Sequence, residues 1–169
     1  MKLFYIAIAF CLVACSEVPP PSPTCRVSNA FEGDYQGPSA CLIRVQNSLL
    51  VLERASTGLY DLAIGDSLSN ESAQCTAHRQ MWENTGFNVE VDQLLSITPD
   101  GTHLFKCHLS GGFDAFDVKV EPPDWASSSV AEIHFVNPFD TRTDNWTHPD
   151  NLIMYRDGYV AIGFVESNK

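Results

Sequence analysis

The chain is poor in basic residues, and no apolar run in it reaches the length of a membrane-spanning helix. It carries 10 Lys and Arg against 21 Asp and Glu, a formal net charge of -11 over 169 residues. Such a charge would repel a phosphate backbone, which argues against a nucleic-acid-binding protein. The longest apolar run falls short of the roughly 20 residues that a transmembrane helix needs, which argues against an integral membrane protein. Charged residues are also few, at 18%, whereas 44% are hydrophobic, a composition typical of globular domains.

The N-terminal residues have the pattern of an export and lipidation signal. Lys2 is followed by apolar residues from Leu3 to Ala14, broken only by the hydroxyl of Tyr5, as in a secretory signal peptide. The run ends Leu-Val-Ala-Cys and resembles a bacterial lipobox. The resemblance implies that Cys15 is acylated and becomes the new N-terminus. An ordinary signal peptide that happens to precede a cysteine is the alternative.

The residues after Cys15 predict where the protein is held. Ser16, by its resemblance to other lipoproteins, implies delivery to the outer membrane, where several acyl chains anchor a protein stably. Residues 16–24 contain four prolines and predict an extended spacer. We therefore predict a signal peptide at 1–14, a lipidated Pro-rich tether at 15–24 and one domain at 25–169. The protein would be an outer-membrane lipoprotein of the bacterial cell envelope, facing the periplasm or the surface.

Four cysteines remain in the predicted domain: Cys25, Cys41, Cys75 and Cys107. In an oxidising compartment they predict disulfides, and three pairings are possible. We favour Cys25 with Cys41 and Cys75 with Cys107, with buried free thiols as the alternative. A tetrathiolate zinc site is disfavoured because the sequence has no C-x-x-C spacing.

Alternating apolar runs and two helical segments predict a single α/β domain without internal repeats. A helix is expected from Glu71 to Thr85, with Asn70 as its N-cap and Gly86 as its C-terminal stop. A second helix is expected at 151–165, although Gly158 and Gly163 weaken it. A hairpin turn is expected at 46–48, and the strands at 40–45, 49–53, 59–64, 87–97, 103–109, 116–120 and 130–136.

The segment from Gly65 to Phe87 carries a family resemblance. It reads GDSLSNESAQCTAHRQMWENTGF and resembles the Nudix box, G-x5-E-x7-R-E-U-x-E-E-x-G-U, of the MutT-like Nudix hydrolases. The flanking runs look like the family's strands, so the resemblance covers about Ser39 to the C-terminus. It implies an α/β fold, the α/β/α sandwich with a mixed β-sheet. Seven defined positions match in register: Gly65, Glu71, Arg79, Met81, Glu83, Gly86 and Phe87.

The resemblance implies a metal site on the box helix. Nudix enzymes hydrolyse nucleoside diphosphates linked to a further group, with glutamates holding Mg²⁺ or Mn²⁺. Here those positions are Gln80, Glu83 and Asn84, which share one helix face. Glu83 would hold the metal, with help from Gln80, Asn84 and a further carboxylate that the sequence does not locate. Glu83 and Gln80 are the catalytic candidates. The amides are neutral and cannot act as general bases, so metal binding is predicted to be weak or absent.

The other expected box residues are structural. The resemblance implies that Glu71 and Arg79 fix the box loop against the helix, with Gly65 and Gly86 as further scaffold positions. Ala63, Ile64 and Asn70 stand where the family has a proline and glycines, so the loop backbone is expected to approach a diphosphate less closely. Packing roles are expected for Met81, Trp82 and Phe87.

A further acid, common in the family before the late strand, has no direct counterpart. Ser127 to Ser129 stand there, and Glu132 is expected to point with its strand. Three other acids, Asp114, Asp117 and Glu121, could lie closer to the metal site in space. We favour surface roles for them. Surface or packing roles are also expected for His78, His103 and His108. The tryptophan of the loop at 145–150 is expected to pack at a helix entry, with stacking on a ligand as the alternative.

These observations leave function classes open. One hypothesis is a Nudix hydrolase-like envelope lipoprotein, anchored through Cys15, that cleaves a diphosphate linkage in a small phosphorylated molecule with weak or altered activity. The alternative is a catalytically inactive Nudix scaffold that binds a ligand or an envelope protein. A purely structural lipoprotein is the third hypothesis, and none involves nucleic acid.

Overall fold

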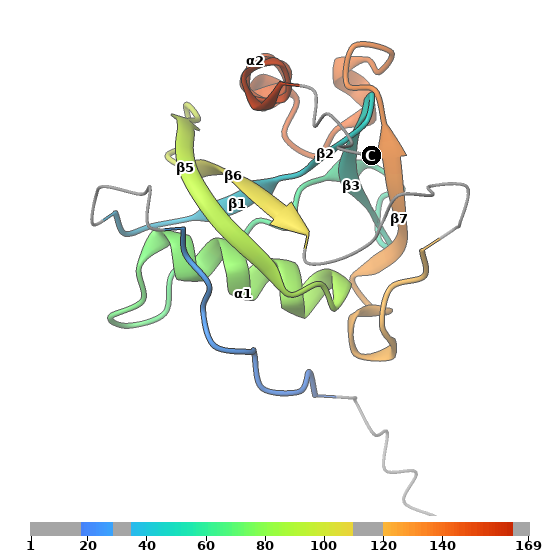
Figure 1. Ribbon diagram of the computed structural model, residues 1–169. Helices are drawn as coiled ribbons and strands as arrows, with labels where there is room; N and C mark the ends of the chain where they lie inside the picture. Colours follow the sequence, from blue (N-terminus) through green and yellow to red (C-terminus); the bar gives the residue numbers. More distant parts are fainter. Residues whose placement is uncertain (1–17, 29–34, 110–119, 164–169) are drawn as a thin grey trace, which may run out of the picture.

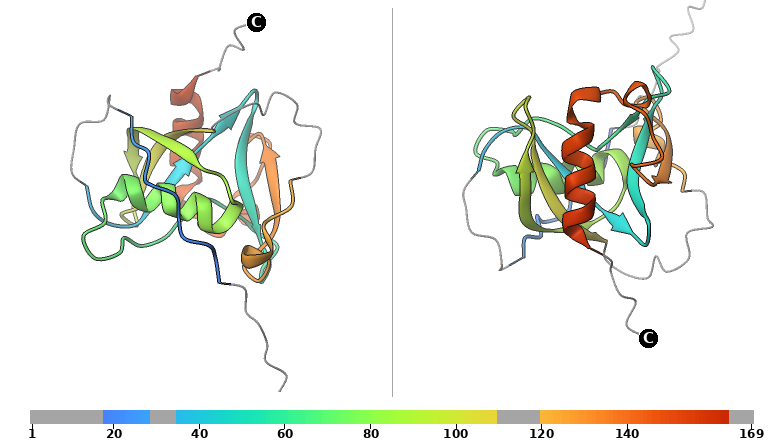
Figure 2. Two further views of the ribbon diagram at one scale, coloured as in Figure 1. Left: turned by 60° about the horizontal axis from the view of Figure 1, so that its bottom comes forward. Right: turned by 90° about the horizontal axis from the view of Figure 1, so that it is seen from above.

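Two β-sheets lie between two helices in the computed structural model of the chain, which describes residues 18–28, 35–109 and 120–163. Helix α1 (Ala73–Thr85) covers one side and helix α2 (Leu152–Ile162) the other (Figure 1). Viewed from the side of α2, that helix runs across the molecule over strands of both sheets (Figure 2). Within the described ranges, no helix combines the length and the apolar character needed to cross a membrane.

The first sheet has the strand order β1-β6-β5 and is mixed. Strand β1 (Ser39–Leu42) pairs in parallel with β6 (His103–Leu109), and β5 (Val89–Ile97) pairs with β6 antiparallel. The second sheet is antiparallel and centres on β3 (Ser48–Arg54), which pairs with β2 (Arg44–Val45), β4 (Tyr60–Asp61) and β7 (Val130–Val136). Short 3₁₀ turns, Asp124–Ala126, Thr143–Asn145 and Pro149–Asn151, connect these elements.

The strand expected at 40–45 is divided between the two sheets. β1 ends at Leu42 and β2 begins at Arg44, so the chain leaves the first sheet and joins the second across Ile43. The expected strand at 59–64 shortens to the two residues of β4. The strand expected at 116–120 falls on residues that the structure does not describe, apart from Val120, which forms an isolated bridge with Ile133.

Both faces of the central strands are buried, which explains their continuous apolar sequences. Successive side chains along a strand point to opposite faces of the sheet, so adjacent residues of a strand pack into two different hydrophobic cores. Leu50 and Leu52 of β3 belong to the core under α1, with Met81. Leu49 and Val51 belong to the core under α2, with Trp146.

Helix α1 begins two residues later than its sequence predicts. Ser72, not Asn70, is the N-cap, and its side chain accepts a hydrogen bond from the Cys75 N–H. Asn70 instead has φ 63°, a left-handed conformation that asparagine tolerates better than most residues. At the other end, Gly86 has φ 73° and donates its N–H to the carbonyl of Trp82, as expected for a glycine stop.

Helix α2 approaches the first sheet closely at a glycine. A Cβ on Gly158 would lie 3.0 Å from Cδ2 of Leu42. Glycine has a low helix propensity, but here its lack of a side chain lets α2 pack closely against β1. The helix ends at Ile162, and Gly163 is its C-cap with φ 72°. The guanidinium of buried Arg44 donates to the backbone carbonyl of Tyr159 at 3.0 Å. Its Cζ also lies 4.0 Å from the centre of the Tyr159 ring, so Arg44 connects β2 to α2.

The four domain cysteines form two disulfides, but the favoured pairing is wrong. Cys25 is bonded to Cys75, and Cys41 to Cys107. Cys41 lies on β1 and Cys107 on the adjacent β6, so pairing across a parallel sheet brings together residues 66 apart in sequence. The sequence alone carries no information about such a contact between strands.

The first disulfide fixes an N-terminal segment, residues 18–28, across the outer side of α1 (Figure 2). Val27 bridges Val91 of β5, and the N–H of Ser28 donates to the Val91 carbonyl at 2.8 Å. The indole Nε1 of Trp82 donates to the carbonyl of Pro20 at 3.1 Å. Part of the predicted proline-rich tether therefore packs against the domain.

Asp100 connects the turn between β5 and β6 to the start of α2. Partial burial acts to raise its pKa, but hydrogen bonds from Thr98, Asn151 and Thr102 outweigh that effect and lower the pKa to about 2. The Asn151 amide donates to Oδ2 at 2.8 Å. The ionised carboxylate therefore stabilises the folded state fully above about pH 4, and that contribution is lost as the pH falls through about 2.

We expect Asp100→Asn to lower the free energy of unfolding at pH 7 by about 1 kcal/mol, after allowance for solvent screening of a half-exposed group. The loss should shrink between about pH 4 and pH 2, because the wild-type carboxylate becomes protonated there. Urea unfolding at several pH values measures this. Asp157→Asn, at an exposed site on α2, is the control. A loss that does not vary with pH would contradict the assignment.

Candidate functional site

The box loop and α1 are held together by a bidentate ion pair. Arg79 donates from Nε to Oε1 of Glu71 at 2.9 Å and from Nη2 to Oε2 at 2.8 Å. Its Nη2 also donates to the carbonyl of Asp66 in the loop at 2.8 Å. Oε2 of Glu71 accepts from the Leu68 N–H and the Thr76 hydroxyl as well. The carboxylate thus organises the loop that leads into the helix.

The ionised forms of this pair are favoured. Burial acts to raise the pKa of Glu71, but the hydrogen bonds from Arg79, from the Leu68 N–H and from Thr76 outweigh it and lower the pKa. The hydrogen bond to Glu71 raises the pKa of Arg79, with a further contribution from Glu83. Because both side chains are largely buried, the pair serves as a structural clamp.

The three positions expected to hold metal lie together on one face of α1, but they bond to one another and to arginines. Glu83 accepts from Nη1 of Arg79 at 3.0 Å and from Nε2 of Gln80 at 3.3 Å. The amide of Asn84 donates to Oε1 of Gln80 at 3.2 Å and to the Gln80 carbonyl at 2.9 Å. Glu83 is the one acid of the three, and about a third of its side chain is exposed.

Arg54, which the sequence pattern did not indicate, completes this face. It is the last residue of β3, and its Nη1 donates to Oδ1 of Asn84 at 3.2 Å. Its Nη2 donates to the carbonyl of Leu62 at 3.0 Å, and its Nε to Oδ2 of buried Asp61 at 2.8 Å. A fixed guanidinium therefore lies beside one of the expected metal positions. The sequence feature that could have pointed to it is an arginine at the end of the apolar strand that precedes β4 and the box.

The side chain of Gln80 occupies the space next to Gly65. A Cβ on Gly65 would lie 2.3 Å from Cδ of Gln80, so the two residues are in close contact. This glycine begins the box, where the family resemblance implies that the backbone approaches a diphosphate. In this chain the amide of Gln80 covers that backbone.

The loop before β7 reaches the C-terminal end of α1 through a tryptophan. Trp125 donates from Nε1 to the carbonyl of Glu83 at 3.2 Å, and its ring lies 6.0 Å from that of Trp82. Hydroxyls of Ser127 and Ser129 bond within their own turn. Of the other acids considered, Asp114 and Asp117 fall outside the described residues, and Glu121 is exposed.

Three histidines and one tryptophan were candidates for a functional role from the sequence. In the structure each of them contacts other residues of the fold. His78 is buried and bonds to Asn88 at 3.0 Å, and His103 contacts the carbonyl of Pro38 at 3.2 Å. His108 is exposed beside Asp92. Trp146 is buried under α2, with its ring 5.3 Å from that of Tyr155, so it packs at the helix entry.

The donor set on the α1 face does not fit a hard divalent cation. Mg²⁺ and Mn²⁺ prefer several carboxylate oxygens, and here Glu83 is joined by two amides. The face and its margin hold two guanidinium groups, Arg54 and Arg79, which already neutralise part of the charge of Asp61, Glu71 and Glu83. A cation that entered would meet Arg54 next to Asn84, and their like charges would repel each other.

Known proteins resemble this chain in sequence and in fold. A MutT-like protein from Streptomyces ambofaciens is 29% identical over 109 residues, which cover 59% of this chain and 71% of that protein. The structure of an ADP-ribose pyrophosphatase from Streptococcus suis matches 73% of this chain and 89% of its own, at TM-score 0.59 and 17% identity. A UDP-X diphosphatase matches 74% of this chain and 62% of its own, at TM-score 0.55 and 14% identity. No family model matches the sequence.

These similarities define the class of fold. The chain has the mixed α/β, single-domain fold of the Nudix hydrolases, which confirms the predicted fold class. Sequence identity to the two solved structures is low, so they establish architecture alone.

Proposed function

We propose that this protein is a Nudix-superfamily lipoprotein of the bacterial envelope that works as a binding domain and not as a metal-dependent hydrolase. The observation that carries the proposal is Arg54, whose guanidinium bonds to Asn84 on the face where the family resemblance implies metal. The lipobox ending at Cys15 supports export and anchoring, and the two disulfides suit an oxidising compartment.

The charge of the face favours a protein partner over a phosphorylated ligand. Two guanidinium groups meet three carboxylates there, so an incoming diphosphate finds no excess of positive charge. The box loop also presents Leu68, which is 61% exposed, beside the ordered Glu71 clamp. Leu68 therefore offers an apolar contact beside the polar groups of the box loop.

A second candidate is hydrolysis of a diphosphate linkage. It is favoured by the partly exposed Glu83 and by the fold shared with an ADP-ribose pyrophosphatase and a UDP-X diphosphatase. In this case Glu83 would hold Mg²⁺ or Mn²⁺, assisted by Gln80 and Asn84.

Calorimetry of the mature domain with Mg²⁺ and Mn²⁺, followed by assays with ADP-ribose and a UDP-sugar, separates the two candidates. We expect no Mg²⁺ or Mn²⁺ binding in the micromolar to low-millimolar range that Glu83→Gln abolishes, and no metal-dependent turnover. Metal-dependent turnover that Glu83→Gln abolishes would establish the hydrolase instead.

The binding role is tested by a photocrosslinking residue at position 68, introduced into the full lipoprotein in its own cell envelope. A discrete adduct is expected from this position and not from position 153, which is exposed on α2 on the opposite side. Equal labelling from both positions, or none from position 68, would contradict recognition through the box loop.

A further inference from the structure

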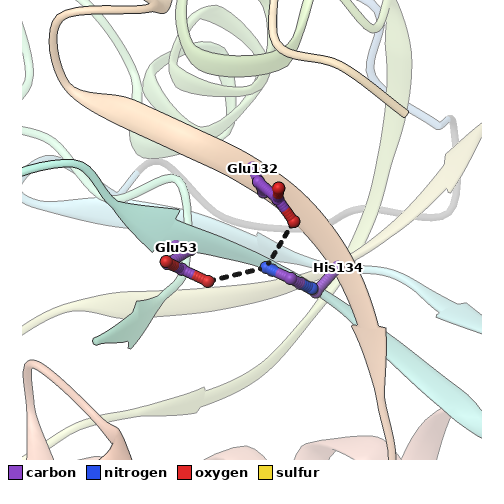
Figure 3. Close-up of side chains that lie close together, drawn as sticks. All are labelled: Glu53, Glu132 and His134. Atoms are coloured by element: carbon purple, nitrogen blue, oxygen red, sulfur yellow. Dashed lines mark hydrogen bonds and ion pairs between the residues drawn. The ribbon is translucent and has the colours of Figure 1, made fainter. Parts of the chain in front are cut away.

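Three potential metal ligands meet on the surface of the second sheet, away from the box face. Glu132 and His134 are two residues apart on β7, so their side chains leave the same face of the strand. Glu53 of β3 lies directly opposite Glu132 in the strand register. Figure 3 shows the three side chains pointing toward one another across the two strands.

The donor atoms are close enough to share one ion. Nε2 of His134 lies 2.9 Å from Oε2 of Glu53 and 3.5 Å from Oε2 of Glu132. All three donor atoms lie within 4.8 Å of one another, and in the described parts of the chain no other set of three His, Cys, Asp or Glu side chains does this. The side chains are about a third exposed, so an ion can reach them from solvent.

The strand register itself creates a need for positive charge. Two carboxylates directly opposite each other on adjacent antiparallel strands destabilise a sheet. Here both converge on one imidazole nitrogen, which supplies positive charge only when it is protonated. A bound dication would offset both carboxylates and leave the imidazole neutral, the form that ligates metal.

This cluster is separate from the box face. Ile133, between the two β7 ligands, packs in the core under α1, so Glu132 and His134 point to the other side. The ring of His134 lies 5.5 Å from that of Tyr60, which packs against the core under α2. Arg54, by contrast, reaches the α1 face through Asn84.

We propose that Glu53, Glu132 and His134 form a site for a divalent transition metal of the zinc type. One imidazole nitrogen and two carboxylate oxygens suit Zn²⁺, which binds these donors in compact tetrahedral sites. Mg²⁺ is a poorer match because it demands octahedral oxygen coordination. Three protein ligands leave a fourth position, which faces the solvent and is open to water or to another ligand.

Zinc titration of the untagged mature domain, monitored by calorimetry and repeated with Co²⁺ by visible absorption, tests the site. We expect one equivalent to bind, and His134→Ala to weaken the affinity by about a hundredfold or more, since even residues that only support metal ligands cost ten- to a hundredfold. His134→Gln, which keeps the bulk and the polar character, should lose binding to the same extent. Glu53→Gln and Glu132→Gln should each weaken binding by at least about tenfold.

His108→Ala is the matched control, because His108 also lies on a strand and beside an acid, Asp92, at 3.1 Å. It should bind zinc as the wild type does. No zinc binding by the wild type, or unchanged affinity in His134→Gln, would overturn the proposal.

The result does not depend on the function proposed above. Glu83→Gln should leave zinc affinity unchanged, whereas metal-dependent hydrolysis at the box would require Glu83. Zinc binding that is lost in Glu83→Gln and retained in His134→Gln would place the ion at the box and overturn the proposal for this cluster.

Discussion

Replacing Cys41 and Cys107 together by alanine is expected to lower the free energy of unfolding by about 4 kcal/mol, a large part of the roughly 5–15 kcal/mol typical of a domain. The bond closes a loop with a sequence separation of 66 residues, and both cysteines are buried in the core under α1. Loss of the crosslink enlarges the conformational freedom of the unfolded chain, and loss of the sulfur atoms leaves space in the core.

The other disulfide supplies the matched control. Cys25→Ala with Cys75→Ala opens a loop of similar size, a separation of 50 residues, but both cysteines are only partly buried. Its loss frees the N-terminal segment from α1 while the sheets keep their contacts, so we expect a smaller decrease in urea or thermal unfolding. Equal losses in the two variants would show that closure of the loop, and not packing of the buried sulfur atoms, sets the size of the effect.

The second large effect concerns repair of the metal face. Gln80→Glu with Asn84→Glu restores the family's three acids, yet we expect Mg²⁺ or Mn²⁺ affinity to rise by less than about tenfold. The new carboxylate at position 84 would lie beside Arg54, and that guanidinium would pair with it in competition with the ion.

Removing the arginine should complete the repair. Because Asp61 is buried and bonded to Arg54, Arg54→Gln is combined with Asp61→Asn so that no buried charge is left unpaired. In that background the two glutamates should raise affinity by about a hundredfold or more, a change of about 2.7 kcal/mol. Calorimetry measures this, with Arg54→Gln/Asp61→Asn as the control.

Two outcomes would contradict this account. Full repair by the two glutamates alone would mean that Arg54 does not compete with metal. Unchanged affinity in the quadruple variant would mean that this face of α1 is not where the fold binds a cation.

The local pattern of the box was sufficient to predict the helix and the fold class. Glu71 and Arg79 are eight residues apart, two helical steps of four, and they lie on one face as that spacing requires. Gly86 ends the helix in the left-handed conformation that glycine favours. Both features concern a single helix and its two ends, and the first follows from the helical repeat of 3.6 residues per turn.

Relationships between elements were beyond the sequence pattern. Pairing of Cys41 with Cys107 depends on β1 lying parallel to β6, and Arg54 reaches Asn84 only because β3 ends beside α1. The Glu53, Glu132 and His134 cluster depends on the register of β3 with β7. An E-x-H alternation on a predicted strand was visible, but its third member required the partner strand.

The N-terminal segment also decides how the domain responds to mechanical load. Tension applied through the chain before residue 18 passes along Pro20 and reaches Cys25, where the covalent bond to Cys75 transfers it to the first turns of α1. Hydrogen bonds such as that from Trp82 to Pro20 would peel away one at a time, but the bond to Cys75 would not. A domain held by its N-terminus would thus be pulled through its box helix while that disulfide stays oxidised.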